Sequence, residues 1–138
     1  MRYIETYKLF ESSDKENLTN DIKDIFLELK DIDMNVSYNK NKAVSTEHFR
    51  KTKEWVSEED LVIRINGGGG GEYFTWGGIK DTIIRVTEYY YTSYNISREK
   101  KMSFYGGSRR ILDNCRKEED FRMDDRVTFT SFTIVIRL

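Results

Sequence analysis

The sequence predicts an α+β domain in which two main helices pack on one face of a mainly antiparallel sheet. Three observations indicate this class. Apolar residues recur at helical spacing in two segments, they alternate with polar residues in several shorter segments, and no repeat or linker divides the 138 residues. A chain of this length buries roughly two thirds of its unfolded surface, which is enough for one core. We therefore expect residues 1–138 to form a single domain.

The first predicted helix covers about Asp14 to Ile32. Ser13 and Glu16 have the spacing of a capping box, which indicates that the helix starts here. The apolar residues are three and four positions apart and form one stripe: Leu18, Ile22, Ile25, Leu29 and Ile32. We expect this stripe to face the sheet.

Two strands and the second helix are predicted in the middle of the chain. Apolar and polar residues alternate at Met34 to Tyr38 and at Leu61 to Ile65, with a polar loop or irregular hairpin, Asn39 to Thr52, between them. Helical spacing returns from about Gly77 to Tyr94, with Thr75 near the cap of this helix.

The C-terminal third is predicted to be mostly β. Met102 to Tyr105 is a short strand candidate, Ser108 to Arg116 is compatible with one or two helical turns, and Lys117 to Arg126 is a charged connector. The last segment, Val127 to Leu138, is rich in β-branched and aromatic residues on both faces. This pattern is typical of a central strand that is covered on at least part of both sides.

The N-terminal segment has two alternative structures. Tyr3, Tyr7 and Phe10 have helical spacing, whereas Tyr3, Tyr7 and Leu9 would lie on one face of a strand. A leader strand would give the ferredoxin-like order β-α-β-β-α-β plus a C-terminal strand. Without that strand the fold is still α+β, with two helices on one face of the sheet.

Composition restricts the partners of the protein. Lysine and arginine total 23 against 24 acidic residues, so nucleic acid or an anionic membrane would need a local patch. No apolar run approaches the roughly 18 residues of a membrane span, which predicts a soluble protein. The single cysteine, Cys115, cannot form an internal disulfide, and this fits a reducing compartment.

A run of five glycines follows the strand at Leu61 to Ile65. A glycine-rich turn into a helix can bind an anion through its bare amides, which makes one hypothetical ligand site of Asn66, Gly67, Gly68, Gly69, Gly70 and Gly71. The spacing matches neither the dinucleotide fingerprint nor the P-loop, and Glu72 places negative charge where a phosphate would lie. Ordering each glycine costs about 0.5–1 kcal/mol relative to alanine, which favours a mobile loop as the alternative.

Aromatic residues suggest a second kind of site. An exposed patch suited to protein binding would consist of Tyr73, Phe74, Trp76, Tyr89, Tyr91 and Tyr94. Tyrosines that cap a sheet edge are the alternative. A sheet with exposed aromatic residues can also stack RNA bases, and the arginines available as nucleic-acid contacts are Arg109, Arg110 and Arg116.

The sequence offers no catalytic set. His48 has no second histidine or cysteine nearby, and Cys115 is expected to be inert, so neither predicts a metal site or nucleophilic catalysis. The acidic residues occur in consecutive groups, which usually cover a solvated surface. We expect no catalytic residue, metal or cofactor.

The segment Met1 to Glu11 resembles the openings of many small proteins of large T4-like tailed bacteriophages. There, a leader that ends in Ile/Leu-x-Glu can direct a protein into the prohead, where a protease cuts after the Glu. The match is Leu9-Phe10-Glu11, and the resemblance covers 11 of 138 residues. It implies a removable leader, residues 1–11, in which Leu9 and Glu11 mark the processing site; the alternative is that this segment is an integral helix or strand.

This resemblance and the missing catalytic set predict a small phage accessory protein that binds a protein partner, either a host factor or a virion component. It would act in the host bacterial cytoplasm, in the virion, or in both. The alternative is a nucleotide- or RNA-binding module that uses the Gly67–Gly71 loop.

Overall fold

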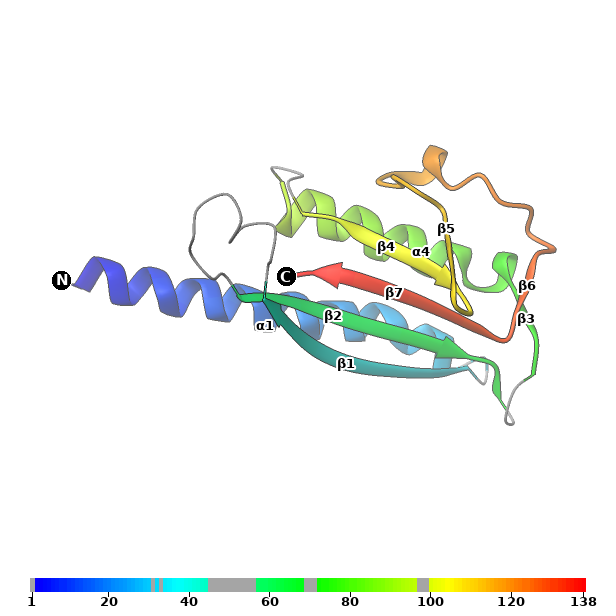
Figure 1. Ribbon diagram of the computed structural model, residues 1–138, viewed down its shortest axis with the longest axis horizontal. Coiled ribbons are helices and arrows are strands. Elements are labelled where there is room, and N and C mark those ends of the chain that lie inside the picture. The colour runs from blue at the N-terminus through cyan, green and yellow to red at the C-terminus, as the bar shows by residue number, and fades with distance from the viewer. Residues whose placement is uncertain (1, 31, 33, 45–56, 69–71, 97–99) are drawn as a thin grey trace.

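A computed structural model of the chain (Figure 1) describes residues 2–30, 32, 34–44, 57–68, 72–96 and 100–138. Its long helices are α1 (Arg2–Lys30) and α4 (Trp76–Tyr89), and a π-helical turn, Tyr90–Tyr94, continues α4. Its strands are β1 (Asn35–Val44), β2 (Ser57–Asn66), β3 (Phe74–Thr75), β4 (Met102–Gly106), β5 (Arg109–Ile111), β6 (Thr128–Phe129) and β7 (Ser131–Arg137).

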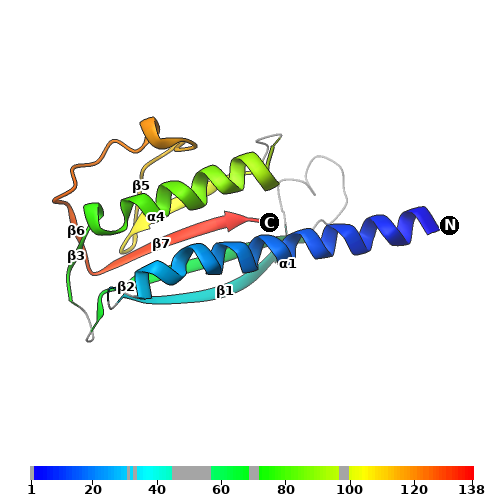
Figure 2. The ribbon, with the colours of Figure 1, turned by 180° about the vertical axis from the view of Figure 1, so that it is seen from behind.

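Five strands form an antiparallel sheet in the order β1-β2-β7-β4-β5, and β3 pairs with β6 separately. Both long helices lie on the same face of the five-stranded sheet, behind the strands in Figure 1 and in front of them in Figure 2. This arrangement confirms the predicted α+β class. No helix in the described part of the chain covers the opposite face, which we call the open face.

The N-terminal segment is helical and belongs to α1, so the leader strand of the ferredoxin-like alternative is absent. The capping box predicted at Ser13 and Glu16 does not start the helix, because both residues lie inside it. No glycine or proline interrupts Arg2–Lys30. The helical spacing of Tyr3, Tyr7 and Phe10 therefore continues into the main helix without a break.

The C-terminal third differs from the prediction in two places. The helical turns predicted for Ser108 to Arg116 are replaced by β5, because Gly107, at φ +66°, turns the chain back so that Ile111 pairs with Phe104. The predicted strand Val127–Leu138 is divided into β6 and β7, since Phe129 pairs with Phe74 in the small sheet. The central position predicted for the last strand is confirmed: β7 lies between β2 and β4.

The core lies between the helices and the sheet. From α1 it receives Leu18, Ile22, Phe26 and Leu29, and from α4 it receives Trp76, Ile79, Ile83 and Val86. The sheet contributes alternate residues of its central strands: Leu61, Ile63, Ile65, Phe132, Ile134, Ile136, Met102 and Phe104. Ile32, which was predicted to face the sheet, is 55% exposed because α1 ends at Lys30.

Polar bridges join the two helices near the solvent. Glu28 of α1 accepts hydrogen bonds from Thr82 and Arg85 of α4, and the Tyr89 hydroxyl donates to Asp21. The bond to Asp21 raises the pKa of Tyr89 to about 12. Bonds from Arg85 and then Thr82 hold the pKa of Glu28 below its ordinary value of 4.5.

The lowered pKa of Glu28 predicts a pH-dependent stabilisation. A depressed carboxyl pKa stabilises the folded state above the unfolded pKa, and this contribution is lost as the pH falls through the folded pKa. We expect Glu28→Gln to lower the free energy of unfolding by up to about 1 kcal/mol at pH 7, because the pair is solvent-exposed. In urea unfolding at pH 3.5 this difference should be much smaller. Glu88→Gln, on an exposed part of α4, is the control.

Candidate functional site

The predicted anion site was the glycine loop, residues 66–71, leading into the N-terminus of α4, and the first amides of that helix already have partners. The Trp76 amide donates to the Val127 carbonyl (2.8 Å), and the Gly77 amide donates to the Asp125 carbonyl (3.0 Å). The next amide, that of Gly78, donates to the hydroxyl of the predicted cap residue, Thr75 (3.2 Å). These bonds leave none of the first three amides for a phosphate.

The glycine run does not lead directly into this helix, because β3 stands between them. At the base of the run, a Cβ on Gly67 would lie 2.0 Å from the Glu72 carbonyl oxygen. The two ends of the loop therefore approach each other closely, and this is possible because Gly67 has no side chain. Gly69, Gly70 and Gly71 lie outside the described residues. Anion binding by the glycine loop therefore stays a prediction.

The six aromatic residues that were predicted to form a protein-binding patch do not form one exposed surface. Phe74, Trp76 and Tyr91 are buried, with Trp76 stacked against Phe121 at a ring distance of 5.9 Å. These large apolar side chains complete the core at the ends of α4, so the prediction of an exposed patch was wrong for these three residues. Tyr89 is half-buried and donates a hydrogen bond to Asp21 of α1, and Tyr94 stacks on Tyr90. Tyr73, at 76% exposed, is the one large exposed aromatic residue of the six.

The three arginines predicted as nucleic-acid contacts do not form one cluster. Arg116 lies over the Tyr91 ring, with Cζ 5.4 Å from its centre. Arg109 and Arg110 are consecutive residues of β5, so their side chains point to opposite faces of the sheet. Arg110 also forms an ion pair with Asp113 (3.0 Å).

The residues that carry reactive chemistry are not assembled into a catalytic site. Cys115 is buried, and burial, with smaller contributions from Asp120 and Asp113, raises the pKa of its thiol to about 11. Its thiol lies 3.2 Å from the Asp120 carbonyl, to which it donates. His48 lies outside the described residues. Among the residues that are described, no three histidine, cysteine or acidic side chains form a metal-binding group.

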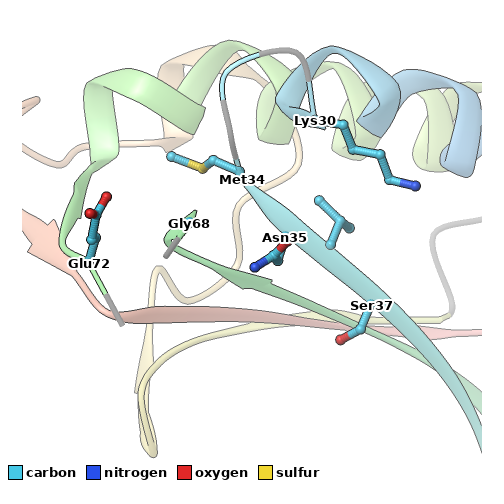
Figure 3. A pocket seen from close by; sticks show the side chains of 7 residues that line it. Lys30, Met34, Asn35, Ser37, Gly68 and Glu72 are labelled. Carbon is cyan, nitrogen blue, oxygen red and sulfur yellow. The ribbon is translucent and has the colours of Figure 1, made fainter. Parts of the chain in front are cut away.

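The structure shows a cavity that was not predicted, at the start of β1. It has a volume of about 680 Å³ and is lined by Lys30, Met34, Asn35, Val36, Ser37, Gly68 and Glu72. Figure 3 shows Lys30 above β1 on α1, with Gly68 and Glu72 near the beginning of the strand. Two amides, those of Ile32 and Met34, donate to the Leu29 carbonyl, which ends the helix and directs the chain into the strand. The cavity therefore joins α1, β1 and the base of the glycine loop.

The cavity follows a sheet edge. Within the described residues β1 pairs with β2 alone, so alternate backbone groups along its other side have no strand partner. Met34 and Val36 point toward the helix side, and Asn35 and Ser37 toward the open face, and all four line the cavity. The cavity thus borders the first residues of this edge. Two large exposed apolar residues, Ile32 and Tyr73, are close in sequence to its lining residues.

The helix side of this edge carries lysines. The Lys23 ammonium lies 5.3 Å from the centre of the Tyr38 ring, and Phe26 packs edge-on against the same ring. Lys30 lies two helical turns after Lys23 on the same face of α1, and it lines the cavity. The acidic residues Asp21 and Glu28 instead face α4. Within the described part of α1, the side near β1 is therefore more basic than the side near α4.

Sequence reasoning missed the residues Met34 to Ser37 as a site. Their alternation predicted a strand, but the position of that strand at the edge of the sheet depends on pairing between distant segments. One weak signal was present. The residues on the open-face side of β1 are all small or polar (Asn35, Ser37, Asn39 and Asn41), which is typical of a strand that is not covered on that side.

The predicted processing site lies inside a helix. Leu9 and Glu11 are part of α1, and the blue end of the helix extends beyond the sheet in Figures 1 and 2. A protease would have to unwind the helix locally in order to cut after Glu11.

Comparison of the chain with known protein families, with curated proteins and with solved structures finds no match. Among the described residues, no helix combines the length and the apolar character that crossing a bilayer requires.

Proposed function

We propose that this protein acts by binding another polypeptide, which adds an extended strand to the free edge of β1 and places a side chain in the adjoining cavity. The observation that carries the proposal is the coincidence of a ten-residue edge strand with a cavity of about 680 Å³ at its start. In strand addition, backbone hydrogen bonds supply affinity and neighbouring pockets supply specificity.

The walls of the cavity suit a peptide. Met34 and Val36 offer apolar contact, and Lys30 and Glu72 offer one charge of each sign. Methionine adapts its shape to different partners at low cost, which favours its use at a binding surface. Tyr73, next to Glu72 in sequence, supplies an exposed aromatic residue of the kind that is enriched at interfaces.

The proposed setting is that of a bacteriophage accessory protein whose partner is a host factor or a virion component. Its support is the resemblance of the segment ending in Leu9-Phe10-Glu11 to phage prohead-targeting leaders. Mass spectrometry of purified virions tests this setting. A packaged protein that begins at Ser12 supports the leader, and a packaged protein that retains Met1 refutes cleavage.

The binding proposal is tested with a partner captured from host lysate and identified by mass spectrometry. Hydrogen–deuterium exchange should then show that alternate amides of β1 exchange more slowly in the complex than in the free protein. Met34→Gln should weaken capture, because it places a polar group in the cavity. Met123→Gln, at a methionine of the connector that is also half-buried, should leave capture unchanged. Protection confined to other elements, or equal effects of the two variants, would refute the β1 site.

A further inference from the structure

The open face of the sheet carries a row of side chains across all five strands. The register pairs Ser37 with Arg64, Arg64 with Thr133, Thr133 with Tyr105, and Tyr105 with Arg110. Successive strands are about 4.8 Å apart, so the backbones of Arg64 and Arg110, three strands apart, are about 14 Å from each other. We call these five residues the cross-strand row.

The alternation of buried and less buried residues along β2 and β4 shows that the row faces away from the helices, and within the row Thr133 of the central strand is 9% exposed. Arg64 is exposed, whereas its neighbours along β2, Ile63 and Ile65, are fully buried in the core. Tyr105 is half-buried, and Phe104 beside it is 1% exposed. Because successive side chains of a strand alternate between faces, Arg64 and Tyr105 lie on the open face.

The charge of this face is unbalanced. Among the strand residues with described side chains that share it, Asp60 is the only acid, and it is neutralised by Arg137 at an Nε–Oδ1 distance of 2.5 Å. Arg64 has no ion-pair partner within the described residues. Arg110 is paired with Asp113, but both side chains are more than half exposed, and such pairs exchange partners at little cost.

Most of the neighbouring side chains on the face are small hydrogen-bonding groups, and the apolar exceptions are Val62 and Val135. The rows on either side contain Asn35, Asn66 and Ser131, and Asn39, Val62, Val135 and Ser103. Amide and hydroxyl groups bind phosphate and sugar oxygens as well as base edges. Positive charge, one aromatic ring and neutral polar groups together match the chemistry of an unpaired nucleic-acid strand.

We infer that the open face binds single-stranded nucleic acid, with a base stacked on Tyr105 and phosphates contacted by Arg64 and Arg110. The three residues that carry this site do not line the β1 cavity, and only Ser37 of the row is shared with it. The site differs from the cluster of Arg109, Arg110 and Arg116 that the sequence predicted. Of those three arginines, only Arg110 belongs to it. No helix is needed to contact the nucleic acid, because the open face of the sheet itself provides the surface on which a base stacks.

The test is fluorescence anisotropy of the full chain with labelled twelve-nucleotide oligo-U, oligo-dT and a duplex of the same length. At 50 mM salt we expect both single strands to bind below about 100 µM and the duplex to bind more weakly. No binding of either single strand in this range, or tighter binding of the duplex, would overturn the inference.

Four substitutions, at three positions, locate the site. Tyr105→Ala should weaken binding by about fivefold or more, while Tyr105→Phe, which keeps the ring, should bind like the unmodified chain. Arg64→Gln should lower the slope of log affinity against log salt by about 0.7, the value for one phosphate contact in a single strand. Arg122→Gln removes the same charge from the exposed connector and should change neither quantity.

The exposed positions of Arg64 and Arg122 make both variants compatible with folding, which thermal melting verifies. Equal losses on Arg64→Gln and Arg122→Gln would mean general charge attraction, and equal losses on Tyr105→Phe and Tyr105→Ala would mean no stacking. Either result would overturn the assignment to the open face.

Discussion

Phe132→Ala is expected to lower the free energy of unfolding by about 3–5 kcal/mol. Phe132 is fully buried on the central strand β7, and its ring contacts those of Trp76 (5.8 Å), Phe129 (5.3 Å) and Phe104 (6.3 Å). Truncation leaves a cavity where the small sheet, α4 and the main sheet meet. Because domains of this size are stable by about 5–15 kcal/mol, the variant should melt at a far lower temperature.

Urea unfolding followed by circular dichroism measures this effect. Val135→Ala is the matched control, because Val135 lies on the same strand but is half-buried on the open face. We expect a loss of about 1 kcal/mol or less from this change. Similar losses for the two variants would contradict the assignment of the core to the helix side of the sheet.

Gly67→Ala is expected to have the second largest effect, a loss of about 1–3 kcal/mol. The added Cβ would lie 2.0 Å from the Glu72 carbonyl oxygen and 2.8 Å from its carbonyl carbon, and a backbone group cannot move aside as a flexible side chain can. The base of the glycine loop would have to open. Since Gly68 and Glu72 both line the cavity at β1, the change should also weaken binding of a polypeptide there.

Gly78→Ala is the control for the glycine substitution. A Cβ at Gly78 meets only the Thr75 hydroxyl, at an ordinary 3.5 Å, and alanine favours a helix more than glycine does. We expect this variant to be as stable as the unmodified chain or more stable by up to about 1 kcal/mol. Thermal unfolding of both variants checks the contrast, and a stable Gly67→Ala would refute the close approach at the loop base.

Local patterns were sufficient for most elements of the fold. The stripe of Leu18, Ile22 and Leu29 predicted α1, and the cap at Thr75 predicted where α4 begins. These predictions hold because the period of apolar residues and the capping of free amides depend on neighbours in sequence. The apolar character of both faces of the last segment likewise predicted the central position of β7.

Segments without a strong local pattern were decided by partners distant in sequence. Arg109 to Ile111 forms a strand because β4 offers an unpaired edge beside it, although its own residues do not alternate clearly. The exposure of Phe74, Trp76 and Tyr91 was wrongly predicted for a related reason. An aromatic residue near a turn faces solvent or core according to what lies across from it, here Phe121, Phe129 and Tyr90.

The sequence by itself determined the α+β class, the single-domain expectation, the main helices and the central strand, because periodicity and capping are local properties. Only the tertiary structure decided which strand is the edge, which arginines share a face, and where a cavity forms. It also decided that the first amides of α4 donate hydrogen bonds to the carbonyls of Val127 and Asp125. Strand order and the partners of a helix end depend on contacts between residues far apart in the chain, and no local pattern encodes these contacts.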